Sequence, residues 1–177
     1  PLLPESFDYI YTSIKPSVQV SSISGGSDII SCFALGNPLL PVRRGELQCK
    51  GLGMAVDIFD QNGHSIIGQQ GELVCTQAFP SMPIYLWNDP HYHQYHKTYF
   101  NQFDNTWRQG DYALITDNNG IIIQGRSDNT LNPGGIRIGS AEIYRHLEPI
   151  HEITDYLATS ITTNGSEKII LFVTLKN

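Results

Sequence analysis

The sequence is poor in the features that mark several large classes of protein. Its 11 basic residues are outnumbered by 17 acidic residues, a formal net charge of −6, so no basic surface indicates nucleic-acid binding. No apolar run approaches the roughly 20 residues that a membrane-spanning helix needs, and the N-terminus lacks the basic-then-apolar pattern of a secretory signal. We therefore expect a cytoplasmic protein with no membrane segment and no nucleic-acid partner.

Cysteine is also scarce. The three cysteines are Cys32, Cys49 and Cys75, an odd number without a CxxC pair. This spacing favours free or buried thiols in a reducing compartment over a disulfide framework or a zinc site.

The remaining composition is that of a folded chain, with 40% hydrophobic and 16% charged residues. A length of 177 residues suffices for one domain, or for one domain and part of another. The chain begins at Pro1 without a starting Met, and the strand pattern of residues 168–177 ends without a partner strand. We expect the sequence to be a segment of something longer.

The first 40 residues have the pattern of an α/β layer. Pro4–Ile14 predicts a helix, because Pro suits a first helical turn and apolar residues recur at helical spacing. Val18–Ile23 alternates and predicts a strand. It leads into the small-residue segment Ser24–Asp28, and ligands bind at such strand ends.

Residues 41–127 predict a β-rich subdomain, either a small antiparallel sheet or a distorted barrel. Asp60–Gly63 and Asp117–Gly120 have the Asn and Gly residues typical of hairpin turns. One helix is expected from Asp89, as its cap, through Phe100. The short strands are predicted to start near Gly45, Gly53, Gly71, Tyr112 and Gly120.

A new unit is expected from residue 128 to residue 177. Residues 131–138 predict a hairpin, Ser140–Leu147 a helix capped by Ser140, and the residues around Asn164-Gly165 two further strands. The whole is then a mixed α+β protein: an α/β strand-loop segment (1–40), a barrel-like antiparallel subdomain (41–127) and a partial α+β domain (128–177).

Two short motifs point to chemistry. Gly110-Asp111 places a carboxylate at the expected start of a strand, where its two oxygens can accept from the vicinal hydroxyls of a ribose. One hairpin later follows Gly125-Arg126-Ser127-Asp128, whose guanidinium suits a sugar or a phosphate. Each motif alone is typical of a plain turn, but a hairpin can bring Asp111 and Arg126 to one site.

Together with the Gly-x-Arg-Ile and Glu-Ile residues between positions 135 and 143, these motifs resemble the adenylate-forming enzymes, which include acyl-CoA synthetases, luciferases and the adenylation domains of peptide synthetases. The resemblance covers about residues 20–145. It implies ATP and coenzyme A as substrates, Asp111 on the ribose hydroxyls and Arg126 on ribose and phosphate. Asp128 would be the hinge between a large and a small domain.

The resemblance extends to the segment Ser24–Asp28, which is similar to the family's Thr-Glu motif. Gly26 and Ser27 would lie at the ATP phosphates, and Asp28 would support Mg²⁺, although Asp reaches one methylene less far than Glu. A capped turn is the alternative interpretation. Arg137 is a candidate for the same site or a surface cation, and Gly135 is either a turn glycine or a wall of the CoA channel.

Within the family, the residues Phe79-Pro-Ser-Met-Pro83, with Trp87–Pro90 and 131–139, resemble acetoacetyl-CoA synthetases. The resemblance places Gly25 where acetate-specific relatives have a Trp that closes the acyl pocket. Glycine leaves room for a longer acid such as acetoacetate, and other medium-length acids remain open.

Two parts that the family's chemistry needs are missing from the sequence: the phosphate loop with its Lys, and the later Gly-Lys motif. Lys168 and Lys176 lie in a strand pattern and are poor substitutes. We therefore assign no catalytic residue and expect the chain alone to form neither adenylate nor thioester. The rival interpretation is a non-catalytic module that binds a nucleotide weakly or not at all.

Three histidines near the expected second helix, His91, His93 and His96, raise the possibility of a metal site. Only His93 and His96 share a helix face, and no carboxylate has a matching offset except Asp89. A solvated helix face is the favoured interpretation.

Overall fold

The computed structural model describes residues 1–128, 130–131, 138–163 and 166–176. The chain forms two compact units, Pro1–Ile123 and Gln124–Asn177, and each is described by itself. None of the described helices has the length and hydropathy of a membrane-spanning helix. All described strand pairs are antiparallel, so the mixed fold with antiparallel sheets is confirmed.

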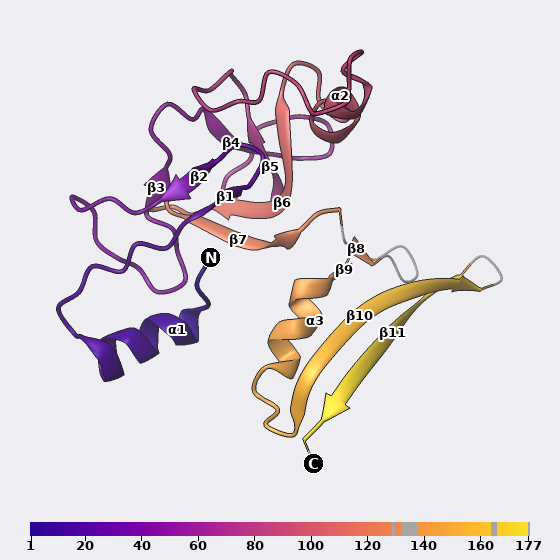
Figure 1. The fold of residues 1–177 in the computed structure, drawn as a ribbon. Helices are drawn as coiled ribbons and strands as arrows, with labels where there is room; N and C mark the ends of the chain where they lie inside the picture. The colour runs from indigo at the N-terminus through magenta and orange to yellow at the C-terminus, as the bar shows by residue number, and fades with distance from the viewer. Residues whose placement is uncertain (129, 132–137, 164–165, 177) are drawn as a thin grey trace. The chain divides into compact units, whose positions relative to one another are not determined.

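The first helical segment consists of α1 (Pro4–Tyr9) followed by a π-helical turn, Ile10–Ile14 (Figure 1). Its bounds confirm the helix predicted from the apolar spacing. Pro4 occupies the first turn, where its missing N–H costs no hydrogen bond, and Phe7 is buried. Arg44 binds the Asp8 carboxylate through Nε and Nη2 at 2.9 and 2.8 Å, which ties this helix to a loop 36 residues later in the chain.

The strand predicted at Val18–Ile23 is wrong. Val20 and Ser22 are buried and their neighbours are exposed, but the apolar Val18 and Ile23 are among the exposed residues, so burial follows the apolar pattern only at Val20. A strand also needs a hydrogen-bonded partner, and the ladder begins only at the following segment. The first sheet has the order β1 (Ser24–Gly26), β2 (Ser31–Leu35) and β3 (Cys49–Lys50).

The second sheet forms the body of the first unit. Its order is β4-β5-β6-β7, with bounds Val56–Phe59, Gly71–Cys75, Trp107–Ile115 and Ile121–Arg126. Across the described strands this sheet is open and does not close into a barrel. The expected strand at Gly45 shortens to a bridge, in which Leu47 and Ile121 exchange backbone hydrogen bonds of 2.8 and 2.9 Å.

Aromatic and aliphatic side chains fill the core between the two sheets and α2 (His93–Tyr99). Trp107 is at its centre, with the rings of Tyr99, Phe79, Tyr95 and Phe100 around it at centroid distances of 3.6 to 6.1 Å. Burial of such large rings is a major source of stability.

The α2 helix begins later than the sequence predicts. Tyr92 has a left-handed φ of 59° and precedes the first helical residue, His93. Asp89 is therefore not the N-cap residue. Its carboxylate still binds the first turn of the helix, because Oδ2 accepts the Tyr95 N–H at 2.9 Å. Burial raises the pKa of Asp89, but hydrogen bonds from backbone N–H groups outweigh it and lower the pKa below its ordinary value.

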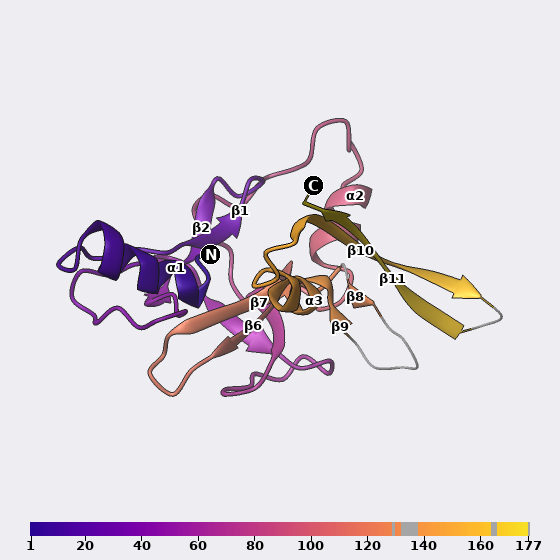
Figure 2. The ribbon, with the colours of Figure 1, turned by 90° about the horizontal axis from the view of Figure 1, so that it is seen from below.

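The second unit contains a long hairpin, β10 (Ile153–Thr163) and β11 (Ser166–Leu175), beside α3 (Ser140–Leu147). Figure 2 shows the hairpin twisting along its length. Tyr144 of α3 packs on Tyr156 at 4.9 Å and accepts the Ala158 N–H at 3.1 Å. The short strands β8 (Thr130–Leu131) and β9 (Ile138–Gly139) pair with each other.

The helix at Ser140–Leu147 is confirmed, but the cap assigned to Ser140 is wrong. Gly139 is the N-cap residue, and no side chain caps this end. Ser140 is already helical, so its hydroxyl is not placed to accept from the N–H groups of the next turn.

Candidate functional site

The small-residue segment forms one arm of a tight hairpin. Gly25 pairs with Cys32 and Gly26 pairs with Ser31. A Cβ atom on Gly25 would lie 2.0 Å from the carbonyl oxygen of Ser31, whereas one on Gly26 would lie 2.9 Å from the Gln109 Nε2 atom. Position 25 therefore requires glycine, because any side chain would collide with the backbone of Ser31. At Gly26 a side chain would meet only the end of the Gln109 side chain, which can move.

The turn of this hairpin presents polar groups to solvent. Ser27 and Asp28 are exposed, while Ile29 is buried in the core. Ile30 has a φ of 48°, a left-handed conformation that β-branched residues rarely adopt, and it is 90% exposed. Strained backbone of this kind is concentrated at functional sites, so the turn is a reasonable place for a ligand.

Strand β6 carries the predicted Gly110-Asp111 motif, and its backbone is irregular there. Glu72 pairs with Tyr112 and Val74 pairs with Arg108, so the three residues 109–111 of β6 oppose one residue of β5. Gly110 has a φ of 80°, which this bulge requires and glycine readily adopts. The sequence predicts Asp111 at the start of a strand. In the structure Asp111 lies in the middle of β6 and is buried.

Strand β6 and the hairpin are in direct contact. The Nε2 of Gln109 donates to the Gly25 carbonyl at 3.5 Å, and the Nε1–H of Trp107 donates to Gln109 Oε1 at 3.1 Å. On the other side of the turn, the Tyr99 hydroxyl of α2 donates to Asp28 Oδ2. The structure thus brings Gly25 and Gly26 next to the strand that carries Asp111, and Asp28 next to α2.

Three of these contact residues were missed by sequence reasoning. The sequence patterns assign no role in the site to Trp107, Tyr99 or Gln109. The available signals were the position of Gln109 directly before Gly110-Asp111 and the helical spacing that buries Tyr99 together with Tyr95.

An ion pair lies beneath the β6 bulge. Arg108 Nε is 3.2 Å from Glu72 Oε1, and the Glu72 side chain is almost fully buried. A buried carboxylate needs such a partner. The pair connects β5 and β6 at the two residues that flank the irregular pairing, so it helps to fix where the bulge occurs.

The predicted residues of the second unit have a local arrangement of their own. Arg126, at the end of β7, donates from Nε to Asp128 Oδ1 at 2.9 Å and from Nη2 to Oδ2. Both side chains are about half exposed. Gly135 and Arg137 lie outside the described residues. The convergence of Asp111 and Arg126 joins residues of different units, so it stays a prediction.

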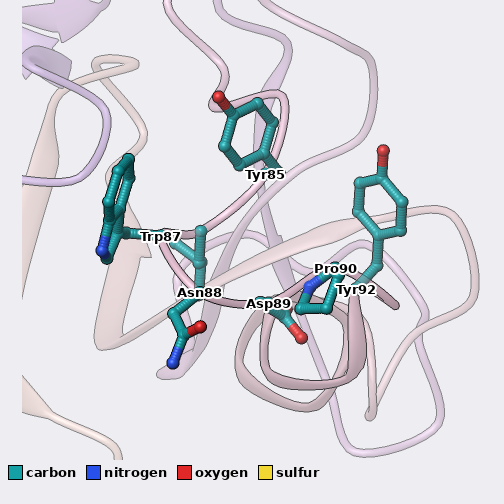
Figure 3. A pocket seen from close by; sticks show the side chains of 7 residues that line it. Tyr85, Trp87, Asn88, Asp89, Pro90 and Tyr92 are labelled. Atoms are coloured by element: carbon teal, nitrogen blue, oxygen red, sulfur yellow. The ribbon is translucent and has the colours of Figure 1, made fainter.

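A shallow pocket of about 440 Å³ lies in the loop before α2 (Figure 3). No residue that the sequence predicted for the site lines it, and Trp87 is 93% exposed there. The pocket is lined by Tyr85, Leu86, Trp87, Asn88, Asp89, Pro90 and Tyr92.

The nearby histidines form a solvated face, as favoured. His91, His93 and His96 are all exposed. Nowhere in the described part of the chain do three His, Cys, Asp or Glu side chains gather as a metal site. The three cysteines are free thiols.

The chain is similar to several known proteins along almost its whole length. It is 54% identical over 175 residues to "Acetoacetyl-coenzyme A synthetase" of Rhizobium meliloti and 46% identical to "Acetoacetyl-CoA synthetase" of Mus musculus, with 99% and 98% of this chain covered. A solved "Acetoacetyl-CoA Synthetase from Streptomyces lividans" matches with a TM-score of 0.85 and 40% identity over 99% of this chain and 27% of that one. No protein-family model matches the sequence.

These matches confirm the resemblance to acetoacetyl-CoA synthetases that the residues in the ranges 79–90 and 131–139 indicated. The chain spans about a quarter of the length of the curated relatives, 27% and 26% of the two named above.

Proposed function

Because this chain is homologous along its length to proteins named acetoacetyl-CoA synthetase, we propose that the complete protein containing it ligates acetoacetate to coenzyme A through an acyl-adenylate, with ATP as the second substrate. The observation that carries the proposal is the contact between the Ser24–Asp28 hairpin and strand β6. It joins the two motifs that the family uses for phosphate and for ribose. The proposed partners are small molecules only.

Different residues of this chain contact different parts of the ATP molecule. Gly26 and Ser27 lie at the phosphates, because the exposed turn offers backbone and hydroxyl donors there. Asp111 accepts from the ribose hydroxyls, and Arg126 donates to ribose and phosphate. Arg137 adds a second guanidinium to this site.

The residues present also suit Mg²⁺ bound together with ATP. Mg²⁺ keeps several waters and is held by one or two carboxylates plus the substrate phosphates, rather than by a dedicated protein cage. Asp28 is an exposed carboxylate on the turn, and it supplies such a single ligand. The ion would neutralise charge on the phosphates.

The reaction then has two displacements. The acid carboxylate attacks the α-phosphorus, a P–O bond forms and pyrophosphate leaves. The CoA thiolate next attacks the acyl carbon, a C–S bond forms and AMP leaves. The residues of this chain orient the ribose and phosphates for the first attack, and motion about Asp128 exchanges the groups that surround the acyl carbon for the second. Gly135 leaves a path for the CoA arm.

The acyl pocket is proposed to lie against Gly25, which leaves volume for an acid longer than acetate. The packing of Gly25 on Ser31 adds a second reason for glycine there. A Gly25→Trp variant would test both reasons at once, since the new side chain would also disturb the hairpin. Substrate preference is therefore better measured on the unaltered protein.

The test is an acid-dependent ATP–pyrophosphate exchange assay on the complete protein, with acetoacetate, acetate, propionate and butyrate compared at equal concentrations. We expect acetoacetate to give the highest kcat/KM, and Asp111→Ala to reduce it by about 100-fold or more. A preference for acetate, or exchange that does not depend on any acid, would overturn the proposal.

The 177-residue chain alone is expected to give no pyrophosphate above background, because it lacks the phosphate loop and the Gly-Lys motif. Release by the purified chain would show that the missing motifs are not needed. A cytoplasmic location completes the proposal, and the three free thiols support it.

A further inference from the structure

Two side chains from outside the known motifs hold the Ser24–Asp28 hairpin in place. Tyr99, on α2, donates its hydroxyl hydrogen to the Asp28 carboxylate. Gln109, on β6, donates to the Gly25 carbonyl. These contacts lie on the carboxylate side and on the glycine side of one short turn, so they limit its motion at two points.

The two side chains are themselves coupled through Trp107. The Tyr99 ring stacks on Trp107 with a centroid distance of 3.6 Å and an interplanar angle of 15°. Trp107 in turn donates to Gln109 Oε1. Because Trp107 is only 1% exposed and is enclosed by other rings, it is a rigid base for both contacts.

We propose that Tyr99 is a positioning residue, which aims the Asp28 carboxylate at the Mg²⁺–phosphate end of the bound nucleotide, with Trp107 and Gln109 holding the rest of the hairpin. This inference rests on the proposed function. Asp28 is exposed and lies two residues before Ile30, whose backbone is strained, so its carboxylate has many accessible orientations unless a neighbour selects one. The hydroxyl of a buried tyrosine on a packed helix makes that selection at little entropic cost.

The helix offers a matched control. Tyr95 lies one turn before Tyr99 and is buried to the same degree, 7% against 8% exposed. Its hydroxyl donates to the Pro83 carbonyl at 2.6 Å, away from the hairpin. Tyr99→Phe and Tyr95→Phe therefore remove the same atom from the same helix, but only the first change touches Asp28.

The first measurement needs no turnover. In the 177-residue chain, the shifts of the denaturation midpoint caused by Tyr99→Phe and by Asp28→Ala are expected not to add, because both remove one shared hydrogen bond. The shifts of Tyr95→Phe and Asp28→Ala are expected to add. Additive shifts for Tyr99 and Asp28 would remove the contact on which the proposal rests.

The second measurement is calorimetric titration of the complete protein with ATP at a series of Mg²⁺ concentrations, without acid. For Tyr99→Phe we expect the Mg²⁺ concentration for half-maximal ATP affinity to rise about tenfold, since a hydrogen bond to a carboxylate is lost. Affinity for ATP in the absence of Mg²⁺ should stay within about twofold, and Tyr95→Phe should match the unaltered protein.

The outcomes separate the two proposals. An unchanged Mg²⁺ dependence in Tyr99→Phe, in a protein that performs acid-dependent exchange, overturns the role of Tyr99 and leaves the proposed function intact. An equal shift in Tyr95→Phe also overturns it, because the effect would then come from the helix in general. A complete protein that neither binds ATP nor exchanges pyrophosphate contradicts the proposed function itself.

Discussion

The two units of the chain differ in what holds them together. In the first unit, Trp107, Phe33 and Ile58 are almost completely removed from solvent. In the second unit, strands β10 and β11 pair without a register shift over residues 155–163 and 166–174, yet apolar residues such as Leu157 and Phe172 are 58% and 57% exposed. Side-chain burial therefore stabilises the first unit, and the backbone hydrogen bonds between β10 and β11 stabilise most of the second unit.

This difference bears on the proposed site, because the hairpin and strand β6 both belong to the first unit. A site that must hold a carboxylate within a narrow range of orientations benefits from rigid, packed support. The second unit holds the proposed hinge, where a change of backbone conformation has to be possible. The proposed mechanism requires this difference: a rigid first unit that holds the nucleotide, and a second unit that can change its backbone conformation at the hinge.

The largest expected effect comes from Trp107, the buried tryptophan of the first unit. Trp107→Ala is expected to lower the free energy of unfolding by about 3–5 kcal/mol, because it empties the centre of the ring cluster. Trp87→Ala is the matched control and should stay within about 0.5 kcal/mol, since that ring is exposed. Urea denaturation followed by circular dichroism measures both, and similar losses would mean that the core is not centred on Trp107.

Next in size is the buried ion pair. Glu72→Ala should cost about 2–3 kcal/mol, less than the roughly 3–5 kcal/mol of a fully buried pair, because Arg108 is partly exposed to solvent. Breaking the exposed pair of the second unit with Asp128→Ala should cost no more than about 1 kcal/mol. If the two variants had the same denaturation midpoint, the difference between the units would not extend to their charges.

The glycine hairpin gives a smaller effect. Gly25→Ala is expected to cost about 1–3 kcal/mol, because its Cβ would meet the Ser31 carbonyl oxygen at 2.0 Å and backbone would have to move. Gly26→Ala should cost less than about 1 kcal/mol, since only the end of the Gln109 side chain must shift. Thermal unfolding of the two variants tests this order, and a more harmful Gly26→Ala would contradict the described hairpin.

How far the sequence predicted these features depends on the range of the interaction involved. The helix at Ser140–Leu147 was predicted within its bounds, because its signal is periodic and local. The strand at Val18–Ile23 was not, since alternation along one segment does not show whether a partner strand is present.

The site followed the same rule. The motifs around Asp28 and Asp111 were visible as short patterns, whereas Tyr99 reaches Asp28 across 71 residues of sequence. No local pattern specifies a contact of that kind, and the bulge at Gly110 likewise depends on the register with β5. The sequence therefore indicates which residues carry the chemistry, and the fold is needed to show which residues position them.

The smallest expected effect tests the exposed hairpin of the second unit. Leu157 and Phe172 are direct cross-strand partners, and such apolar pairs are coupled by roughly 0.2–1 kcal/mol. Because both side chains are more than half exposed, we expect the coupling to lie near the lower end of that range. The measurement is a double-mutant cycle of Leu157→Ala and Phe172→Ala, read from amide hydrogen exchange of the hairpin so that local opening is detected.

The same exchange experiment compares the units directly. Amides of β5 and β6 should exchange through the highest-energy openings, and those of β10 and β11 through openings of lower free energy, because little apolar surface is buried along the hairpin. A coupling well above 1 kcal/mol, or equal protection in the two units, would mean that Leu157 and Phe172 are covered in solution. The ladder would then not be the main support of the second unit, and the contrast with the first unit would fail.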